Sequence, residues 1–257
     1  MSLRTIIKEK LTASQKKRLR NLLNDLRSIG HGNDLTALAT IYGTDKWGIH
    51  YYTPRYASHF RKFRYKRIRL LEIGVGGYEE PQGGGQSLRM WKRYFPLGRI
   101  FSVDIYDKSA LEERRVRIFK GSQVDRDFLE RVVRETGPLH FIIDDGSHRN
   151  EHVIETFKLL FPALRDGGIY VVEDAETSYW SSYGGGSPGA GGMHTTMNFF
   201  KRLADGINFR EFPEPGYQPD YYEGNVTSVH FYHNLIVVYK GVNDERSVRE
   251  LGLHEGT

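Results

Sequence analysis

The sequence predicts an α/β protein with a mostly parallel, doubly wound sheet. From Arg67 onward, short apolar runs bounded by turn residues alternate with longer amphipathic stretches. Apolar runs of this length are typical of strands buried on both faces, and their alternation with helices indicates a parallel sheet. Near the end of the chain, 226–232 and 235–240 are rich in β-forming residues and are separated only by His233 and Asn234. That short link fits an antiparallel hairpin.

The elements between these points follow in order along the chain. We expect parallel strands at 68–73, 99–104, 116–119, 140–144 and 168–173. The helices that connect them are expected at 87–95, 126–136, 151–164 and 195–206. With the two strands of the hairpin, the sheet has seven strands. A mostly parallel sheet that ends in an antiparallel hairpin is the architecture of the class I S-adenosylmethionine-dependent methyltransferases, which is a Rossmann-like fold.

The first 30 residues are rich in lysine and arginine, and their leucines recur at a spacing that predicts one or two amphipathic helices. A further helix is expected from Leu35 to Ile41. We therefore divide the chain into a helical extension over 1–35, a methyltransferase domain over 36–245 and a tail over 246–257. Because an amphipathic face outside the core needs something to cover it, the extension favours a homo-oligomer.

Composition excludes several classes of protein. The chain has no cysteine, so disulfides, thiolate catalysis and zinc–thiolate sites are ruled out. No apolar run approaches the roughly 20 residues of a membrane span, and no apolar stretch follows the basic N-terminus as it would in a secretory signal. We expect a cytoplasmic protein with neither a membrane nor a nucleic acid as partner.

The positive charge of the chain allows two interpretations. The net charge is +5 and the pI is about 9.2, which suits either an anionic partner or simply a basic surface. The run Lys16-Lys17-Arg18 leaves the same choice between contact with phosphates and a solvated helix face.

Two acidic clusters are the most informative feature of the chain. Asp144 and Asp145 follow one predicted strand, with His148 three residues further on, and Glu173 and Asp174 follow the next. Carboxylates at such strand ends point into the crevice where open α/β sheets bind ligands, and they repel one another unless a cation or protons lie among them. Oxygen ligands favour Mg²⁺, Mn²⁺ or Ca²⁺ over zinc. The clusters therefore predict a metal site beside a histidine; a solvated turn and a surface histidine are the alternatives.

Glycines directly follow the first predicted strand, where the backbone turns tightly and approaches a ligand closely. Glu72, Gly74 and Gly76 form the pattern E-x-G-x-G. A dinucleotide fingerprint would place its third glycine or alanine at Glu79, so that motif is excluded. The acidic residue two positions before the first glycine instead resembles a methyltransferase motif. We therefore expect these three residues at an S-adenosylmethionine site.

Two later strand ends carry further polar residues. Asp104 ends the second strand, where a carboxylate can accept hydrogen bonds from both hydroxyls of a ribose; a helix cap or a surface turn is the alternative. Ser122 and Gln123 follow the third strand. They could present polar groups to the edge of an adenine, or they could form a plain turn.

Six segments together resemble one group of enzymes more specifically. They are Tyr42–Lys46, Leu71–Tyr78, Gly85–Trp91, Asp104–Lys108, Asp145–His148 and Tyr232–Leu235. In combination they resemble the metal-dependent sugar O-methyltransferases of antibiotic biosynthesis, of the mycinamicin deoxysugar 2-O-methyltransferase type and the calicheamicin-type and elloramycin-type rhamnose O-methyltransferases. The resemblance covers about residues 40–241. It implies methyl transfer from S-adenosyl-L-methionine to a deoxysugar hydroxyl, with Mg²⁺ or Mn²⁺ as a second cofactor.

The resemblance also implies roles for single residues. Asp145, Glu173 and Asp174 match the metal ligands, and His148 matches the general base. Asp144 would lie beside the methionine end of the cofactor. The residues at or near cofactor contacts are Glu72, Gly74, Ser87, Asp104 and Gln123.

One difference from the mycinamicin type affects the expected substrate. Enzymes of that type carry a large N-terminal auxiliary domain that helps to hold a macrolide, whereas about 35 residues precede the matching core here. We therefore expect a nucleotide-linked sugar, or a glycoside that is held in another way.

Other functions stay open at the level of the sequence. A nucleic-acid methyltransferase would share the fold and the basic charge but would not need three carboxylates in the crevice. A catechol-type methyltransferase acting on a phenolic precursor would have almost the same crevice. A non-enzymatic protein that binds S-adenosylmethionine would need no metal.

Two further features have a double interpretation. The stretch from Gly184 to Gly192 suits a lid over the crevice or a disordered spacer. Seven aromatic residues suit either a sugar-stacking pocket or an ordinary core; they are Trp47, Tyr51, Tyr52, Tyr179, Trp180, Tyr221 and Tyr222.

Overall fold

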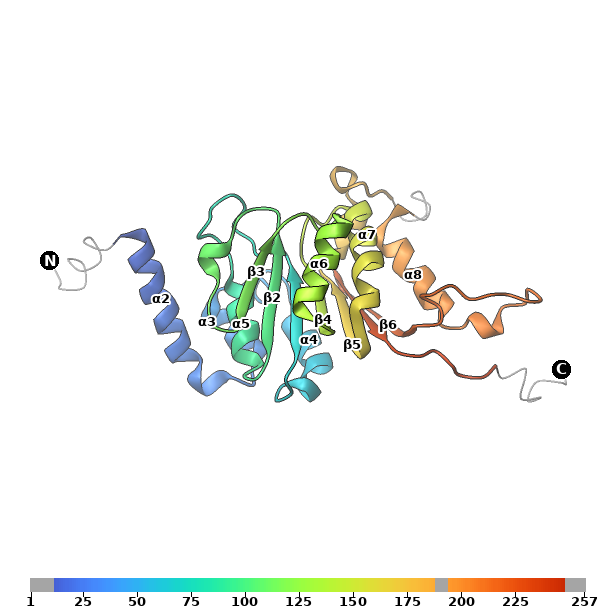
Figure 1. Cartoon of the computed structure of the whole chain (residues 1–257), viewed down its shortest axis with the longest axis horizontal. Coiled ribbons are helices and arrows are strands. Elements are labelled where there is room, and N and C mark those ends of the chain that lie inside the picture. Colours follow the sequence, from blue (N-terminus) through green and yellow to red (C-terminus); the bar gives the residue numbers. More distant parts are fainter. Residues whose placement is uncertain (1–11, 188–193, 248–257) are drawn as a thin grey trace. The chain divides into compact units, whose positions relative to one another are not determined.

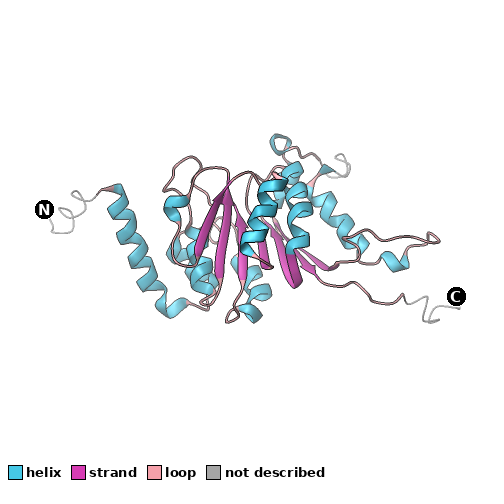
Figure 2. Ribbon diagram, in the orientation of Figure 1, coloured by secondary structure: helices cyan, strands magenta, loops and turns pink. Residues whose placement is uncertain are grey.

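The computed structural model of the chain describes residues 12–187 and 194–247 (Figure 1). Its strands, drawn in magenta in Figure 2, pair into one sheet. The sheet has seven strands in the order β3-β2-β1-β4-β5-β7-β6. The strands are β1 (Arg69–Ile73), β2 (Arg99–Asp104), β3 (Val116–Lys120), β4 (Leu139–Asp144), β5 (Leu164–Val172), β6 (Val226–Tyr232) and β7 (Leu235–Lys240). β4 pairs in parallel with β1 and β5, while β7 runs antiparallel to β5 and β6. The predicted class I methyltransferase fold, with its terminal hairpin, is confirmed.

The helices occupy most of the predicted ranges. They are α2 (Ala13–Arg27), α3 (Leu35–Tyr42), α4 (Thr53–Phe60), α5 (Gln86–Tyr94), α6 (Arg126–Thr136), α7 (Asn150–Leu160) and α8 (Thr196–Gly206). None of the helices in the described ranges has the length and apolar character that a membrane crossing requires. Residues 1–11 of the expected extension and residues 248–257 of the expected tail lie outside the described residues.

Two predicted boundaries are wrong, and both have the same cause. The helix expected over 151–164 ends at Leu160, and the strand expected over 168–173 already begins at Leu164. Pro162 lies between them in a short 3₁₀ turn. Because proline lacks an N–H and its ring clashes with the preceding turn, it ends the helix and lets the strand start early.

Helix α4 was not predicted from the sequence. Pro54 lies in its first turn, where the missing N–H of proline costs nothing. Its buried face consists of aromatic rings rather than a leucine stripe: Tyr56 lies 4.9 Å and Phe60 lies 5.8 Å from the ring of Trp91, measured between ring centroids. The helix therefore depends on tertiary packing with α5 rather than on a regular leucine pattern.

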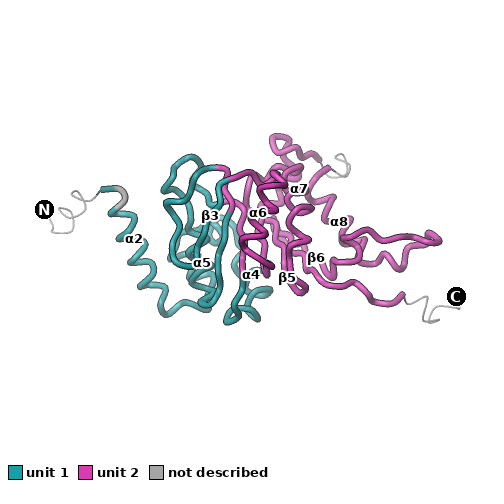
Figure 3. The backbone as a smooth tube through the Cα atoms, viewed as in Figure 1, with its two compact units in different colours: residues 1–68, 75–102, 106–120 teal, residues 69–74, 103–105, 121–257 magenta. Residues whose placement is uncertain are grey.

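The chain forms two compact units (Figure 3). The first consists of residues 1–68, 75–102 and 106–120, and the second of residues 69–74, 103–105 and 121–257. In the first unit, α3 packs against α2, α4 and α5. In the second, α7 packs against β4, β5, α6 and α8, and the buried ring of Phe157 stacks on Phe161 at 4.7 Å and meets Tyr170 edge-on at 5.0 Å. All the predicted metal ligands lie in the second unit.

Candidate functional site

The carboxyl ends of β1, β4 and β5 lie side by side in the second unit. The N–H of Asp145 donates to the carbonyl of Ile73 at 3.0 Å, and the N–H of Glu173 donates to the carbonyl of Asp144 at 3.0 Å. These bonds continue the parallel pairing one residue beyond each strand. As a result, the acidic residues that follow β4 and β5 are neighbours in space.

Gly74 makes the closest approach at this edge. Its φ is +94°, and a Cβ atom at this position would lie 2.1 Å from the carbonyl oxygen of Asp145. Such a separation is far below van der Waals contact, so the residue has to be glycine. The glycine after β1 therefore fixes the backbone of the β4 loop and, through it, the carboxylate of Asp145.

The predicted metal ligands converge in two overlapping groups. Glu72, Asp145 and Glu173 each offer a carboxylate oxygen, and these oxygens lie within 4.8 Å of one another. Asp145 also belongs to a second group of the same dimensions, with His148 and Asp174. Glu72, expected only as a cofactor contact, is fully buried and lies directly among the acids. Carboxylate oxygens in this number fit a hard divalent cation.

The predicted base lies beside two of these acids. The Nε2 atom of His148 is 3.6 Å from a carboxylate oxygen of Asp174 and 4.0 Å from one of Asp145. His148 has a φ of +55° and Asp174 a φ of +52°, both in the left-handed region that non-glycine residues rarely adopt. Strained residues of this kind cluster at functional sites and persist only where the surroundings hold them.

The loop that carries His148 is held by side-chain contacts that the sequence did not reveal. The N–H of Ser147 donates to Oε1 of Gln123 at 2.8 Å, and the hydroxyl of Ser147 is 2.9 Å from Nδ1 of His152. Gln123 donates in turn to the hydroxyl of Thr156 at 2.9 Å and to Asp144 at 3.3 Å. Gln123 and α7 therefore hold the backbone immediately before His148.

This arrangement bears on the role expected for Gln123. Both polar atoms of its side chain are engaged with the protein, and the residue is buried. The contact with an adenine edge stays a prediction, while the contacts with Ser147, Thr156 and Asp144 are present. Nothing in the local sequence marks Gln123 as a brace, because its partners are 21 to 33 residues away along the chain.

Asp144 is the most strongly perturbed group of the site. Burial raises the pKa of its carboxyl to about 7, and the charge of Asp145 adds to the rise. Hydrogen bonds from Tyr170, the N–H of Gly146 and Gln123 act in the opposite direction and lower the pKa. The hydroxyl of Tyr170 donates to Asp144 at 3.3 Å, and burial together with the carboxylate raises the pKa of this tyrosine well above its ordinary value.

The other expected cofactor residues lie at or near the ends of strands and helices. Asp104 ends β2, and its carbonyl accepts the N–H of Gly121 at 2.9 Å. Ser122 accepts the N–H of Val124 at 3.3 Å, which is the plain-turn arrangement. In the first unit, Gly76 has a φ of +77° and Ser87 lies in the first turn of α5. Their contact with a cofactor stays a prediction.

The segment after Asp174 is anchored by Asn150, a second residue missed at the sequence level. Its buried amide donates to the carbonyls of Thr177 and Tyr183 at 3.3 and 2.9 Å and accepts the N–H of Thr196 at 2.6 Å. Residues 188–193 of the glycine-rich stretch lie outside the described residues, so the expected lid stays a prediction.

The hairpin of β6 and β7 also contacts the segment after Asp174, because the N–H of Ala175 donates to the carbonyl of Asn234 at 3.1 Å.

Of the seven aromatic residues proposed for a pocket or a core, only Tyr52 is buried, at 2% exposure, whereas Tyr179 and Trp180 are 42% and 50% exposed. Tyr179 and Trp180, the aromatic residues nearest to the acids in sequence, are therefore exposed rather than part of the core.

Comparison with known proteins places this geometry in context. The chain is 46% identical over 217 residues to mycinamicin VI 2''-O-methyltransferase of Micromonospora griseorubida, an alignment that covers 84% of this chain and 54% of that protein. It is 46% identical over 218 residues to demethylmacrocin O-methyltransferase of Streptomyces fradiae, covering 84% and 55%. No protein-family model matches the chain. The chain thus spans about half the length of the curated relatives it matches.

A solved structure agrees with this similarity. The MycE methyltransferase from the mycinamycin biosynthetic pathway, in complex with Mg and SAH, superposes with a TM-score of 0.81 at 46% identity. The superposition covers 84% of this chain and 56% of MycE. The resemblance to sugar O-methyltransferases found in the sequence is confirmed.

The close approach at Gly74 can be tested by Gly74→Ala. We expect a loss of about 3 kcal/mol in the free energy of unfolding, because the substitution adds both a positive-φ penalty and a collision. Gly167→Ala is the matched control: its φ of +73° is similar, but a Cβ there meets nothing within 4 Å. Equal losses in urea unfolding for the two variants would show that the contact with Asp145 has no effect.

The raised pKa of Asp144 predicts a pH dependence of stability. Between the unfolded value of 3.8 and the folded value of about 7, the folded state holds a proton that the unfolded state releases. Stability therefore falls as the pH rises through this window, by up to about 4 kcal/mol for this group. We expect Asp144→Asn to flatten the fall in unfolding free energy between pH 5 and pH 8, measured in urea with EDTA present. Parallel pH profiles for the native protein and the variant would contradict this.

Proposed function

We propose that the chain is an S-adenosylmethionine-dependent, divalent-metal-dependent O-methyltransferase that acts on a hydroxyl of a deoxysugar. The observation that carries the proposal is the convergence of Glu72, Asp145 and Glu173 within 4.8 Å, next to His148 and Asp174. The identity of 46% to mycinamicin VI 2''-O-methyltransferase supports the same activity. We assign the reaction to the expected domain over 36–245.

The donor set fits the proposed metal. The acidic groups of the cluster offer carboxylate oxygens, and a chain without cysteine has no thiolate ligand. Asp145, Glu173 and Asp174 would hold the ion, and the position of Glu72 makes it a further candidate ligand. When bound, Mg²⁺ or Mn²⁺ would lower the pKa of a coordinated sugar hydroxyl.

The residues of the chain supply the proton transfer. His148 would accept the hydroxyl proton at Nε2, the atom that faces the carboxylates of Asp174 and Asp145. These carboxylates would stabilise the positive charge that then forms on the ring. Gln123 and His152 hold Ser147 and thereby the backbone before His148, so the imidazole would be positioned before the substrate binds.

Several features support a sugar as the acceptor. MycE has been solved with Mg, SAH and mycinamycin VI, and two relatives are named as acting on rhamnosyl tetracenomycin C. The exposed rings of Tyr179 and Trp180 follow the acidic pair after the short segment 175–178 and suit stacking against the apolar face of a sugar. We propose a rhamnose-like deoxysugar, either nucleotide-linked or as a glycoside, and a cytoplasmic enzyme.

The decisive experiment is methyl transfer from S-adenosylmethionine to a panel of nucleotide-linked deoxysugars and glycosides, with Mg²⁺ and with EDTA. We expect a methylated sugar with Mg²⁺ and a loss of turnover with EDTA. Turnover that is insensitive to EDTA would remove the metal from the proposal. Product on a catechol but on none of the sugars would identify a phenolic acceptor instead.

The base can be tested by His148→Ala. We expect turnover to fall by about 10²- to 10⁴-fold, the usual contribution of a general base. Binding of S-adenosylmethionine, measured by calorimetry, should stay unchanged because His148 is assigned only to the sugar hydroxyl. Near-normal turnover in this variant would exclude His148 as the base.

Asp145→Asn provides the contrast. This variant should lose both Mn²⁺ binding, followed by electron paramagnetic resonance, and turnover, because Asp145 belongs to both groups of candidate ligands. A loss of turnover with unchanged Mn²⁺ binding would place Asp145 outside the metal site.

We also propose that the chain forms a homo-oligomer through the apolar face of α2 and the turn after it. The exposed residues of this face are Leu19, Leu22, Leu23, Leu26 and Ile29. We expect light scattering to give a multiple of 29.7 kDa for the native chain and a smaller mass for the double variant Leu23→Glu/Leu26→Glu. A native mass of one chain would exclude the oligomer.

A further inference from the structure

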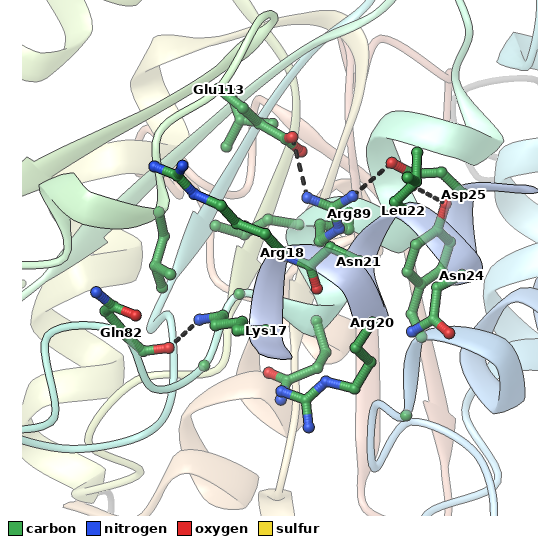
Figure 4. A pocket seen from close by; sticks show the side chains of 18 of the residues that line it. Lys17, Arg18, Arg20, Asn21, Leu22, Asn24, Asp25, Gln82, Arg89 and Glu113 are labelled. Atoms are coloured by element: carbon green, nitrogen blue, oxygen red, sulfur yellow. Dashed lines mark hydrogen bonds and ion pairs between the residues drawn. The ribbon is translucent and has the colours of Figure 1, made fainter. Parts of the chain in front are cut away.

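A cavity of about 890 Å³ lies within the first compact unit (Figure 4). One wall is α2; the remainder comes from α3, α5, the loop 82–85 and the segment 110–116. Pockets for small molecules usually measure roughly 300–1,000 Å³, so this cavity has the size of a ligand site. None of the residues that line the cavity belongs to the carboxylate cluster, which lies in the second unit.

The acids that line the cavity are all engaged with the protein. Asp25 and Glu113 hold Arg89 between them, at 2.6 and 3.0 Å (Figure 4). Glu113 also pairs with Lys92 at 3.0 Å. The carboxylate of Glu112 accepts the N–H of Ile118 at 2.8 Å. The carboxylates of the cavity therefore already form ion pairs with Arg89 and Lys92 and a hydrogen bond with one backbone amide.

The cations that α2 contributes are not balanced in this way. Lys17, Arg18, Arg20 and Arg27 line the cavity. Within residues 12–187 and 194–247, none of the four forms an ion pair with a carboxylate. Lys17 instead donates to the carbonyl of Gln82, and Arg18 and Arg20 are exposed, so a ligand can reach them from solvent.

The surroundings of Lys17 indicate an excess of positive charge. Partial burial lowers the pKa of its ammonium, and Arg20, Arg89 and Lys108 lower it further by repulsion. Glu80 opposes this change but does not cancel it. Lys108 is itself buried and donates to the carbonyls of Glu80 and Gly83, at 2.7 and 3.4 Å. Lys17 and Lys108 therefore both bind the loop 80–83.

The other lining groups suit a ligand that is only partly charged. Side-chain amides come from Asn21, Asn24, Gln82 and Gln86, and apolar lining comes from Ile41 and Leu111 together with the largely buried Leu88 and Val116. A free phosphate or sulfate would fill only a small part of 890 Å³. A nucleotide combines adjacent anionic groups with a planar base and polar edges, so it matches cations, apolar surface and amides together.

We propose that this cavity binds the diphosphate group of a nucleotide, with Lys17, Arg18 and Arg20 as the phosphate contacts. Arginine forks and a lysine ammonium are the usual protein partners of such groups. Of the two interpretations open for the run Lys16-Lys17-Arg18, the structure favours phosphate contact for Lys17 and Arg18, which line the cavity, and a solvated face for Lys16, which does not. The proposal rests on the cavity alone and does not depend on methyl transfer.

Binding can be measured by calorimetry on the full chain, with uridine diphosphate, a uridine-diphosphate sugar and uridine as probes. S-adenosylhomocysteine is kept in excess so that a nucleoside site in the proposed cofactor crevice is blocked. We expect both diphosphates to bind at least about tenfold more tightly than uridine, because charge-assisted bonds to phosphate each contribute about one factor of ten or more. Equal affinity for uridine and uridine diphosphate would overturn the proposal.

The double variant Lys17→Gln/Arg20→Gln should weaken binding of uridine diphosphate at least about tenfold. Lys16→Gln is the control: it removes one positive charge, half of what the double variant removes, from the same helix outside the cavity, and it should retain the native affinity. Lys17→Arg/Arg20→Lys keeps both charges and should restore most of the binding. Unchanged affinity in the double Gln variant, or an equal loss in Lys16→Gln, would overturn the proposal; circular dichroism checks that each variant is folded.

A nucleotide-linked sugar and a free nucleotide present the same diphosphate. Tighter binding of the uridine-diphosphate sugar than of uridine diphosphate would assign the cavity to a substrate carrier, and equal affinity would assign it to the nucleotide itself. Both results keep the diphosphate site. Because the readout is binding, failure of this proposal would leave the methyl-transfer proposal untouched, and failure of methyl transfer would leave the cavity.

Discussion

The close approach of the ends of β1 and β4 is the constraint on which the site depends. It requires a residue without a side chain at Gly74, since a Cβ there would lie 2.1 Å from the carbonyl of Asp145. With this contact made, the N–H of Asp145 reaches the carbonyl of Ile73 and the N–H of Glu173 reaches that of Asp144, each at 3.0 Å. Three strand ends are thereby held in register. The backbone contacts at the strand ends therefore bring the carboxylate side chains together.

Bringing the carboxylates together is energetically unfavourable, and hydrogen bonds from the surrounding polar residues offset part of this penalty. A buried carboxylate such as Asp144 loses hydration, and the nearby charge of Asp145 adds repulsion. Tyr170 and Gln123 donate hydrogen bonds to Asp144 and so offset part of both effects. Gln123 also accepts the N–H of Ser147, so the same residue that moderates the buried acid holds the loop that carries His148. The hydrogen bond that stabilises Asp144 and the hydrogen bond that positions the loop before His148 therefore come from one side chain.

The two compact units differ in the chemistry they present. The second unit gathers carboxylates and a histidine at its strand ends, which suits a cation. The first unit contains a cavity whose acids are engaged and whose α2 cations have no ion-pair partner among the described residues, which suits an anion. The net charge of +5 averages over these regions and describes neither of them. The partner of a basic protein is better inferred from where its charges are left unbalanced than from their sum.

The sequence by itself determined the fold class, the sheet's terminal hairpin and the residues of the acidic cluster, because alternating apolar runs and strand-end carboxylates are local signals. Only the tertiary structure decided that Glu72 lies among these acids, that Gln123 and His152 brace the loop of His148, and that Lys17 but not Lys16 faces a cavity. Each of these facts joins residues far apart in the chain, or depends on which side of a helix packs inward. Helix α4 was missed for the same reason, since its aromatic face has meaning only against Trp91. The periodicity of apolar residues predicts whether a segment is a helix or a strand, and long-range packing determines which residues that segment contacts.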